Sequence, residues 1–111
     1  MKQIIETSKE LTKIEKYHLT SSNSTQSIRN FENQILEIEY WARFTDTNEN
    51  GDTTEILSMA TKDGEFIATN SAIVMRAFEE IVEAFGDDLP PVKIFTGTSK
   101  NGRKYYNVTV A

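Results

Sequence analysis

Hydrophobic and polar residues alternate through the middle of the chain, beginning at Gln34. One face of this segment carries the side chains of Leu36, Ile38, Tyr40, Ala42 and Phe44. The opposite face carries Glu37, Glu39, Trp41 and Arg43. A period of two is typical of a strand with one buried face, so we expect a long, half-buried strand here.

Further strands and one clear helix follow along the chain. Strands are expected over residues 54–61, 66–69, 92–98 and 104–110. Three residue pairs typical of hairpin turns separate them: Asn50-Gly51, Asp63-Gly64 and Asn101-Gly102. Between the third and fourth strands, apolar residues at helical spacing predict a helix that Asn70 or Ser71 caps and Gly86 ends.

The expected order is therefore three strands, a helix and two strands (β-β-β-α-β-β). This is the element order of the OB-fold, a five-stranded, partly open antiparallel barrel. We expect a mainly β chain with one helix in this OB-fold-like barrel. A helix packed on an antiparallel sheet of another topology would give the same order, and the sequence leaves that alternative open.

The first 31 residues differ from the rest of the chain. Thr7-Ser8-Lys9-Glu10 has the form of a capping box and predicts a short helix over residues 8–18. Residues 21–27 are all Ser, Asn, Thr or Gln, which is typical of a linker or flexible loop. We therefore expect a helical or flexible N-terminal extension over residues 1–31 and an OB-fold-like domain over residues 32–111.

Length and composition narrow the class of protein. A chain of 111 residues can bury the core of one domain. The absence of cysteine excludes a disulfide scaffold and a thiolate metal site, and fits a reducing compartment. No apolar run approaches the ~20 residues that span a bilayer, and charged residues interrupt any signal-peptide core. We expect a soluble, intracellular protein without membrane contact.

Charge is strongly divided along the chain. Residues 32–88 contain fourteen acidic and three basic residues, a local net charge of −11. After Asp88 there is no acidic residue, and the remaining cations are Lys93, Lys100, Arg103 and Lys104. Because a local patch sets the attraction for a polyanion, the basic C-terminal segment is the part of the chain most suited to one.

The strand pattern places aromatic residues beside these cations. Tyr105 points away from the expected core, as do Trp41 and Arg43. An outward aromatic ring can stack on a base while a neighbouring cation contacts a phosphate, as in single-strand binding. The candidate binding residues are Trp41, Arg43, Lys93, Lys100, Arg103, Lys104 and Tyr105.

The alternative to a binding site is an ordinary barrel rim, with solvated hairpin lysines and with aromatics half buried against the N-terminal segment. Four other aromatics are expected in the core: Tyr40, Phe44, Phe66 and Phe95.

Other chemistry has little support in the sequence. Residues 46–52 match the opening of an EF-hand calcium loop, but the twelfth position is Leu57, where the motif requires a glutamate. The single histidine, His18, and the absence of cysteine leave no nucleophile–base pair or imidazole metal site. We expect no catalytic residue, metal or cofactor, and no enzymatic activity.

Four segments carry a family resemblance. They are Gln34-Ile-Leu-Glu-Ile-Glu before Trp41, Asn50-Gly51-Asp52, Lys62-Asp63-Gly64-Glu65-Phe66-Ile67-Ala68-Thr69, and Thr98-Ser99-Lys100-Asn101-Gly102-Arg103-Lys104-Tyr105-Tyr106. In order and spacing, roughly from Ser27 to Ala111, the chain resembles the small single-stranded DNA-binding proteins of phi-29-like, protein-primed phages of Gram-positive bacteria. The resemblance implies an OB-type fold and non-specific coating of displaced strands, in the host cytoplasm.

The resemblance also implies roles for particular residues. Strand-contacting aromatics would be Trp41 and Tyr105, with cations at Arg43, Lys100, Arg103 and Lys104. The chain departs from the family in its first hairpin loop, residues 46–52, which is acidic where a binding loop would be neutral or basic.

Two functions follow from these patterns and from the resemblance. The first is non-sequence-specific binding of single-stranded DNA, or RNA, in phage DNA replication. Its partners would include replication proteins such as a DNA polymerase, and residues 1–20 would serve self-association. The second is an acidic protein-interaction module, in which residues 32–88 bind a basic host or replication protein.

Overall fold

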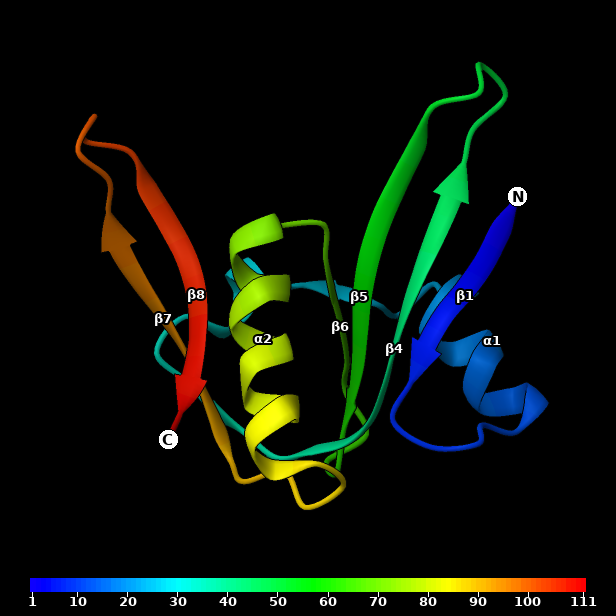
Figure 1. Ribbon diagram of the computed structural model, residues 1–111, viewed down its shortest axis with the longest axis horizontal. Helices are drawn as coiled ribbons and strands as arrows, with labels where there is room; N and C mark the ends of the chain where they lie inside the picture. The colour runs from blue at the N-terminus through cyan, green and yellow to red at the C-terminus, as the bar shows by residue number, and fades with distance from the viewer.

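The computed structural model describes residues 1–111 and contains two β-sheets and two α-helices (Figure 1). The five-stranded sheet has the order β1 (Lys2–Thr7), β4 (Ile38–Thr47), β5 (Thr53–Thr61), β6 (Phe66–Thr69) and β2 (Gln26–Ser27). The three-stranded sheet consists of β3 (Ile35–Leu36), β7 (Val92–Thr98) and β8 (Lys104–Val110). The helices are α1 (Lys13–Ser21) and α2 (Ala72–Phe85), with a short 3-10 helix, η1, over Ile28–Phe31. The expectation of a mainly β chain is confirmed.

The two sheets do not close into a barrel. Strand β8 is the last strand of its sheet, and β6 pairs with β2 rather than with β8. The strand predicted from residue 34 is divided at Glu37, so that β3 belongs to the small sheet and β4 to the large one. The register of β4 against β5 shifts between Ile38 and Tyr40, which marks a bulge where the chain passes from one sheet to the other.

Helix α2 packs against both sheets in the main core (Figure 1). Ser71 begins the helix, because its Oγ accepts a hydrogen bond from the backbone N–H of Val74. Gly86 ends it with a positive φ of 61° and an N–H bond to the carbonyl oxygen of Val82. The buried side of the helix includes Phe78, which meets the Trp41 ring edge-on at 5.4 Å between centroids.

The N-terminal segment differs from the expected extension. Residues 2–7 form β1, an edge strand paired with β4, and the helix begins only at Lys13. The pattern Thr-x-x-Glu occurs twice here, and the capping box is formed by Thr12 and Glu15 rather than by Thr7 and Glu10. The polar stretch 21–27, expected to be a linker, leads from α1 into β2 at the edge of β6.

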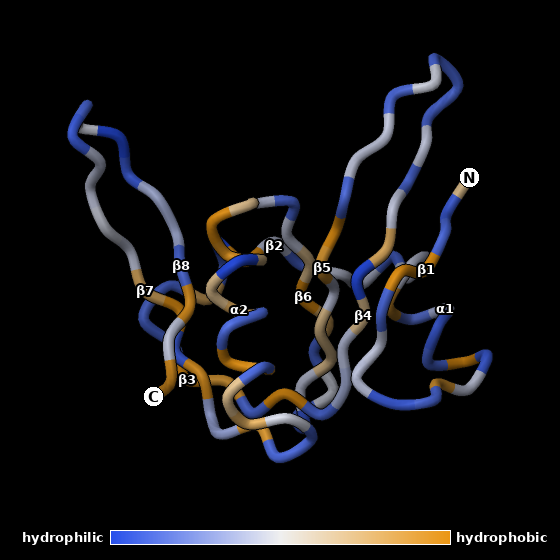
Figure 2. The backbone as a smooth tube through the Cα atoms, viewed as in Figure 1, coloured by the Kyte–Doolittle hydropathy of each residue, from blue (hydrophilic) through white to orange (hydrophobic).

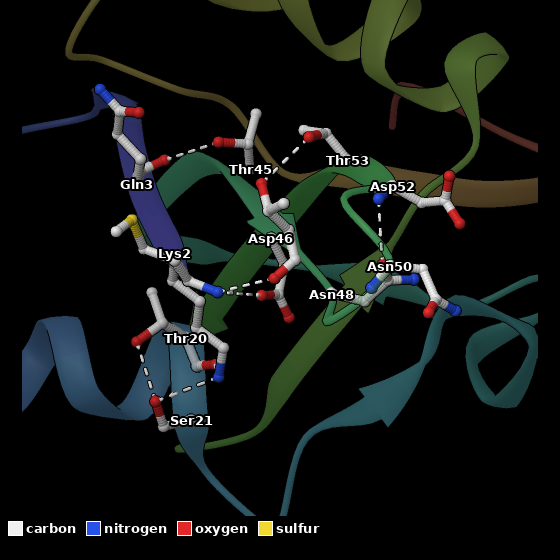
Figure 3. Close-up of polar contacts among 12 residues, drawn as sticks. Lys2, Gln3, Thr20, Ser21, Thr45, Asp46, Asn48, Asn50, Asp52 and Thr53 are labelled. Carbon is white, nitrogen blue, oxygen red and sulfur yellow. Dashed lines mark hydrogen bonds and ion pairs between the residues drawn. The ribbon is translucent and has the colours of Figure 1, made fainter.

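Helix α1 covers the other face of the large sheet. Leu11 and Leu19 are buried against Tyr40, Ala42 and Ala60 in a second, smaller core. The His18 ring stacks on Phe66, with 4.9 Å between centroids. Lys2 Nζ donates to the carbonyl oxygen of Thr20 at 2.6 Å, which joins β1 to the C-terminal end of the helix (Figure 3).

We expect the N-terminal segment to contribute directly to stability. The Leu19→Ala variant removes a side chain that is 2% exposed, and should lower the free energy of unfolding by about 2–5 kcal/mol. Ile14→Ala is the matched control, because Ile14 lies on the same helix but is 70% exposed. Urea denaturation measures both. Equal midpoints for the two variants would contradict the packing of α1 on the sheet.

Candidate nucleic-acid interface

Two hairpins extend from the same side of the molecule, one formed by β4 and β5 and the other by β7 and β8 (Figure 1). A groove of about 960 Å³ lies between them. It is lined by residues 27–30 before and within η1, Thr54 and Ile56 of β5, Ala68 and Thr69 of β6, Asn70 and Ser71 at the start of α2, and residues 104–106 of β8. The groove therefore runs beside the unpaired edge of β8.

The two hairpins that flank the groove carry opposite charge at their tips. The tips of both hairpins are hydrophilic (Figure 2). The β7–β8 tip carries Lys100 and Arg103, both exposed, whereas the β4–β5 tip carries Glu49 and Asp52, also exposed. Arg29 of η1 adds an exposed cation to the groove itself. A bound polyanion would therefore be attracted to the β7–β8 wall and repelled by the opposite one.

Lys104 lies on the core-facing side of β8, where the groove begins. Its Nζ contacts a Glu32 carboxylate oxygen at 2.7 Å and lies 5.3 Å from the centroid of the Tyr106 ring. The hydrogen bond from Lys104 lowers the pKa of Glu32 and raises the pKa of Lys104. A phosphate that bound to Lys104 would therefore have to displace a carboxylate.

Tyr105 points the other way, onto the outer face of the small sheet. It is half-buried and lies opposite Gly97 of β7. A Cβ atom at position 97 would lie 2.4 Å from the Cζ and Oη atoms of Tyr105. The tyrosine ring therefore occupies the space that a side chain at this position would need. The prediction that Tyr105 faces away from the core is confirmed.

The predicted outward positions of Trp41 and Arg43 are wrong. Trp41 is 4% exposed and belongs to the main core. Arg43 is held by three carboxylates, those of Glu6, Glu55 and Glu79, at 3.2, 3.0 and 3.6 Å. The physical reason is that β4 is buried on both faces, by α2 on one side and by the N-terminal segment on the other. Alternation correctly placed Trp41 opposite Tyr40 and Ala42. It was wrong for Leu36 and Ile38, which lie in the main core with Trp41, because the bulge between Ile38 and Tyr40 changes the face that follows. It also did not indicate that both faces of β4 are covered.

Three of the remaining predicted residues gather on one hairpin, and one lies apart. Lys100, Arg103 and Lys104 occupy the β7–β8 tip and the strand that follows it. Lys93 lies on the outer face, opposite Thr109, and does not line the groove.

Two residues close to the C-terminal hairpin were not among the binding residues predicted from the sequence. Arg29 lies in the segment predicted to be an extension, and no local pattern connected it with the C-terminal hairpin. Phe95 was expected in the core but is half-buried and belongs to neither core cluster. A signal for Phe95 was present, because it alternates with Ile94, which is fully buried. Tyr40 and Phe44 are buried, as expected, and Phe66 packs at the edge of the second core.

The residues that matched part of a calcium loop form a turn. Asn48 Oδ1 accepts hydrogen bonds from the backbone N–H groups of Asn50 and Asp52, at 2.9 and 3.0 Å (Figure 3). Gly51 has a φ of +85°, which a turn of this kind requires. The side chain of Asn48 and the backbone conformation of Gly51 are therefore explained by the turn itself.

Comparisons with known proteins give no relative for this chain: no family model, no curated protein and no solved structure matches it. Neither α-helix combines the length and the apolar character needed to cross a membrane.

The ion pair between Glu32 and Lys104 should be visible in the titration of Glu32. In the native protein its carboxyl should titrate below the ordinary pKa of 4.5, and in the Lys104→Gln variant its pKa should return toward that value. The pair thus adds stability above pH 4.5 that is lost as the pH falls through the lowered pKa. NMR of the side-chain carboxyl carbon measures both titrations. Identical curves in the two proteins would show that the pair does not form.

Proposed function

We propose that this protein binds single-stranded DNA without reading its sequence, along the groove between the two hairpins. The observation that supports this most strongly is the composition of one wall. Lys104, Tyr105 and Tyr106 follow one another along an unpaired strand edge, and Arg29 faces them from η1. Rings that stack on bases and cations that contact phosphates are the two elements of sequence-independent binding to single strands.

The arrangement of the strands also favours an OB-like fold. In OB-folds, oligonucleotides bind across the second and third strands, between the loop joining strands one and two and the loop joining strands four and five. Counting β3 and β4 as one bent strand, β5 and β6 are the second and third strands, and the two projecting hairpins contain the two loops. On this view the barrel is left open between β6 and β8.

The charges of the walls suggest how the strand would lie. Phosphates would follow the β7–β8 hairpin, where Lys100 and Arg103 form no ion pair and Lys104 would exchange Glu32 for a phosphate. They would avoid the acidic tip at Glu49 and Asp52. Such binding reads no base edges. It suits the role that the phage-family resemblance implies, which is coating strands displaced during DNA replication.

Salt-dependent binding tests this function. Fluorescence anisotropy of a labelled thymidine oligomer should show binding that weakens steeply with salt, and weaker binding to duplex DNA. The Lys100→Gln, Arg103→Gln, Lys104→Gln triple variant should reduce the slope of log K against log salt by about 2, because each lost phosphate contact removes about 0.7. Trp41 is buried, so its fluorescence is a poorer readout than anisotropy.

A matched triple variant separates local contacts from net charge. Lys13, Lys16 and Lys62 are exposed and do not line the groove, so changing them to Gln removes the same charge elsewhere. This control should bind almost as the native protein does. Equal losses in the two triple variants, no binding at low salt, or tighter binding to duplex DNA would contradict the proposal.

The exposed acidic tip of the β4–β5 hairpin favours one other function, a docking site for a basic protein. Glu49 and Asp52 form no ion pair within the chain. The cation variants distinguish the two functions, because a complex made through the acidic tip would survive the loss of Lys100, Arg103 and Lys104.

A further inference from the structure

We infer that the outer face of the three-stranded sheet is a second surface for bases of the same strand, with Phe95 and Tyr105 as its stacking residues. The inference rests on the proposed function and extends it beyond the groove. It assigns a role to Phe95, Lys93 and Gly97, which do not line the groove.

The alternation along β7 and β8 defines this face. Val92, Ile94 and Val108 are at most 4% exposed and face α2 in the main core. Their neighbours along each strand point the opposite way and pair in three rows: Lys93 with Thr109, Phe95 with Asn107, and Gly97 with Tyr105. The core-facing side is covered by α2, whereas Phe95 and Tyr105 belong to neither core cluster.

Gly97 allows the Tyr105 ring to lie across β7. The nearest ring atoms, Cζ and Oη, would be 2.4 Å from a Cβ at this position, closer than any side chain permits. One side of the ring is therefore supported by the strand while the residue stays half exposed. Phe95 is the diagonal neighbour of Tyr105 on the same face, within reach of an aromatic ring.

The charge of this face favours a nucleic acid over other partners. Lys93 lies beside Phe95, and Lys100 and Arg103 lie at the tip above Tyr105, in a segment without any acidic residue. Flat rings with interspersed cations match bases and phosphates. The face is also continuous with the groove, because Tyr105 borders the groove along the edge of β8. A strand that leaves the groove over this edge reaches Phe95 next.

Oligomer length separates the two surfaces. A thymidine oligomer of about 6 nucleotides would occupy the groove alone, whereas one of about 20 would also reach the outer face. The Phe95→Leu variant keeps apolar volume but removes a ring that lies on the outer face and does not line the groove. It should bind the long oligomer at least about fivefold more weakly and the short one almost unchanged, because the short oligomer does not reach this ring. Tyr17→Leu, at a 58% exposed tyrosine on α1, is the matched control and should change neither affinity.

Gly97→Ala tests the position of the ring without removing it. The new methyl group should displace the Tyr105 ring and weaken binding of the long oligomer about as much as Tyr105→Leu does. Adding Gly97→Ala to Tyr105→Leu should then cause no further loss. Thermal unfolding followed by circular dichroism checks that each variant is folded.

The possible failures are distinguishable. If the native protein binds no oligomer, the proposed function and this inference both fail. If the Lys100, Arg103 and Lys104 triple variant weakens binding while Phe95→Leu binds the long oligomer as the native protein does, the outer face is not used and only the inference fails. Competition by poly-glutamate as effective as that by poly-thymidine would also overturn it, because charge alone would then account for binding.

Discussion

The burial of β4 on both faces is the constraint on which the rest of the molecule depends. Trp41 packs against Phe78 of α2 on one side, and Tyr40 and Ala42 pack under α1 on the other. Because β3 leads into β4 through a single residue, this strand also joins the small sheet to the large one. The two hairpins are therefore held apart by a packed core, and the groove between them is a consequence of that packing.

The same constraint divides the charges of the molecule. Burial of β4 draws Arg43 into contacts with three carboxylates, which removes it from the cations available to a ligand. The remaining cations near the groove lie on β7–β8 and on η1, facing an acidic hairpin. Even Lys104 is held by Glu32. A polyanion would thus be steered to one wall, and its affinity would be limited by the carboxylate that it displaces.

The sequence predicted the elements whose signals are local. The Asn-Gly and Asp-Gly turns, Ser71 and Gly86 fixed the hairpins and α2 nearly to the residue. It failed where distant segments decide the outcome. Strand β1 forms because β4, about 40 residues away in sequence, offers an edge, and nothing within residues 1–10 indicates that pairing. Trp41 was correctly placed opposite Tyr40 and Ala42 but was expected to face outward, because its burial under α2 depends on tertiary packing that alternation does not encode.

Chemical-shift mapping tests the central claim, that a single strand lies in the groove between the hairpins. Amide resonances of the protein labelled with nitrogen-15 would be followed during titration with a thymidine oligomer. The largest shifts should fall on residues 104–106, on Arg29 and on Asn70 and Ser71, which line the groove from three separate elements. Shifts concentrated on α1 or on the acidic tip at residues 48–52, with the groove unchanged, would contradict the account.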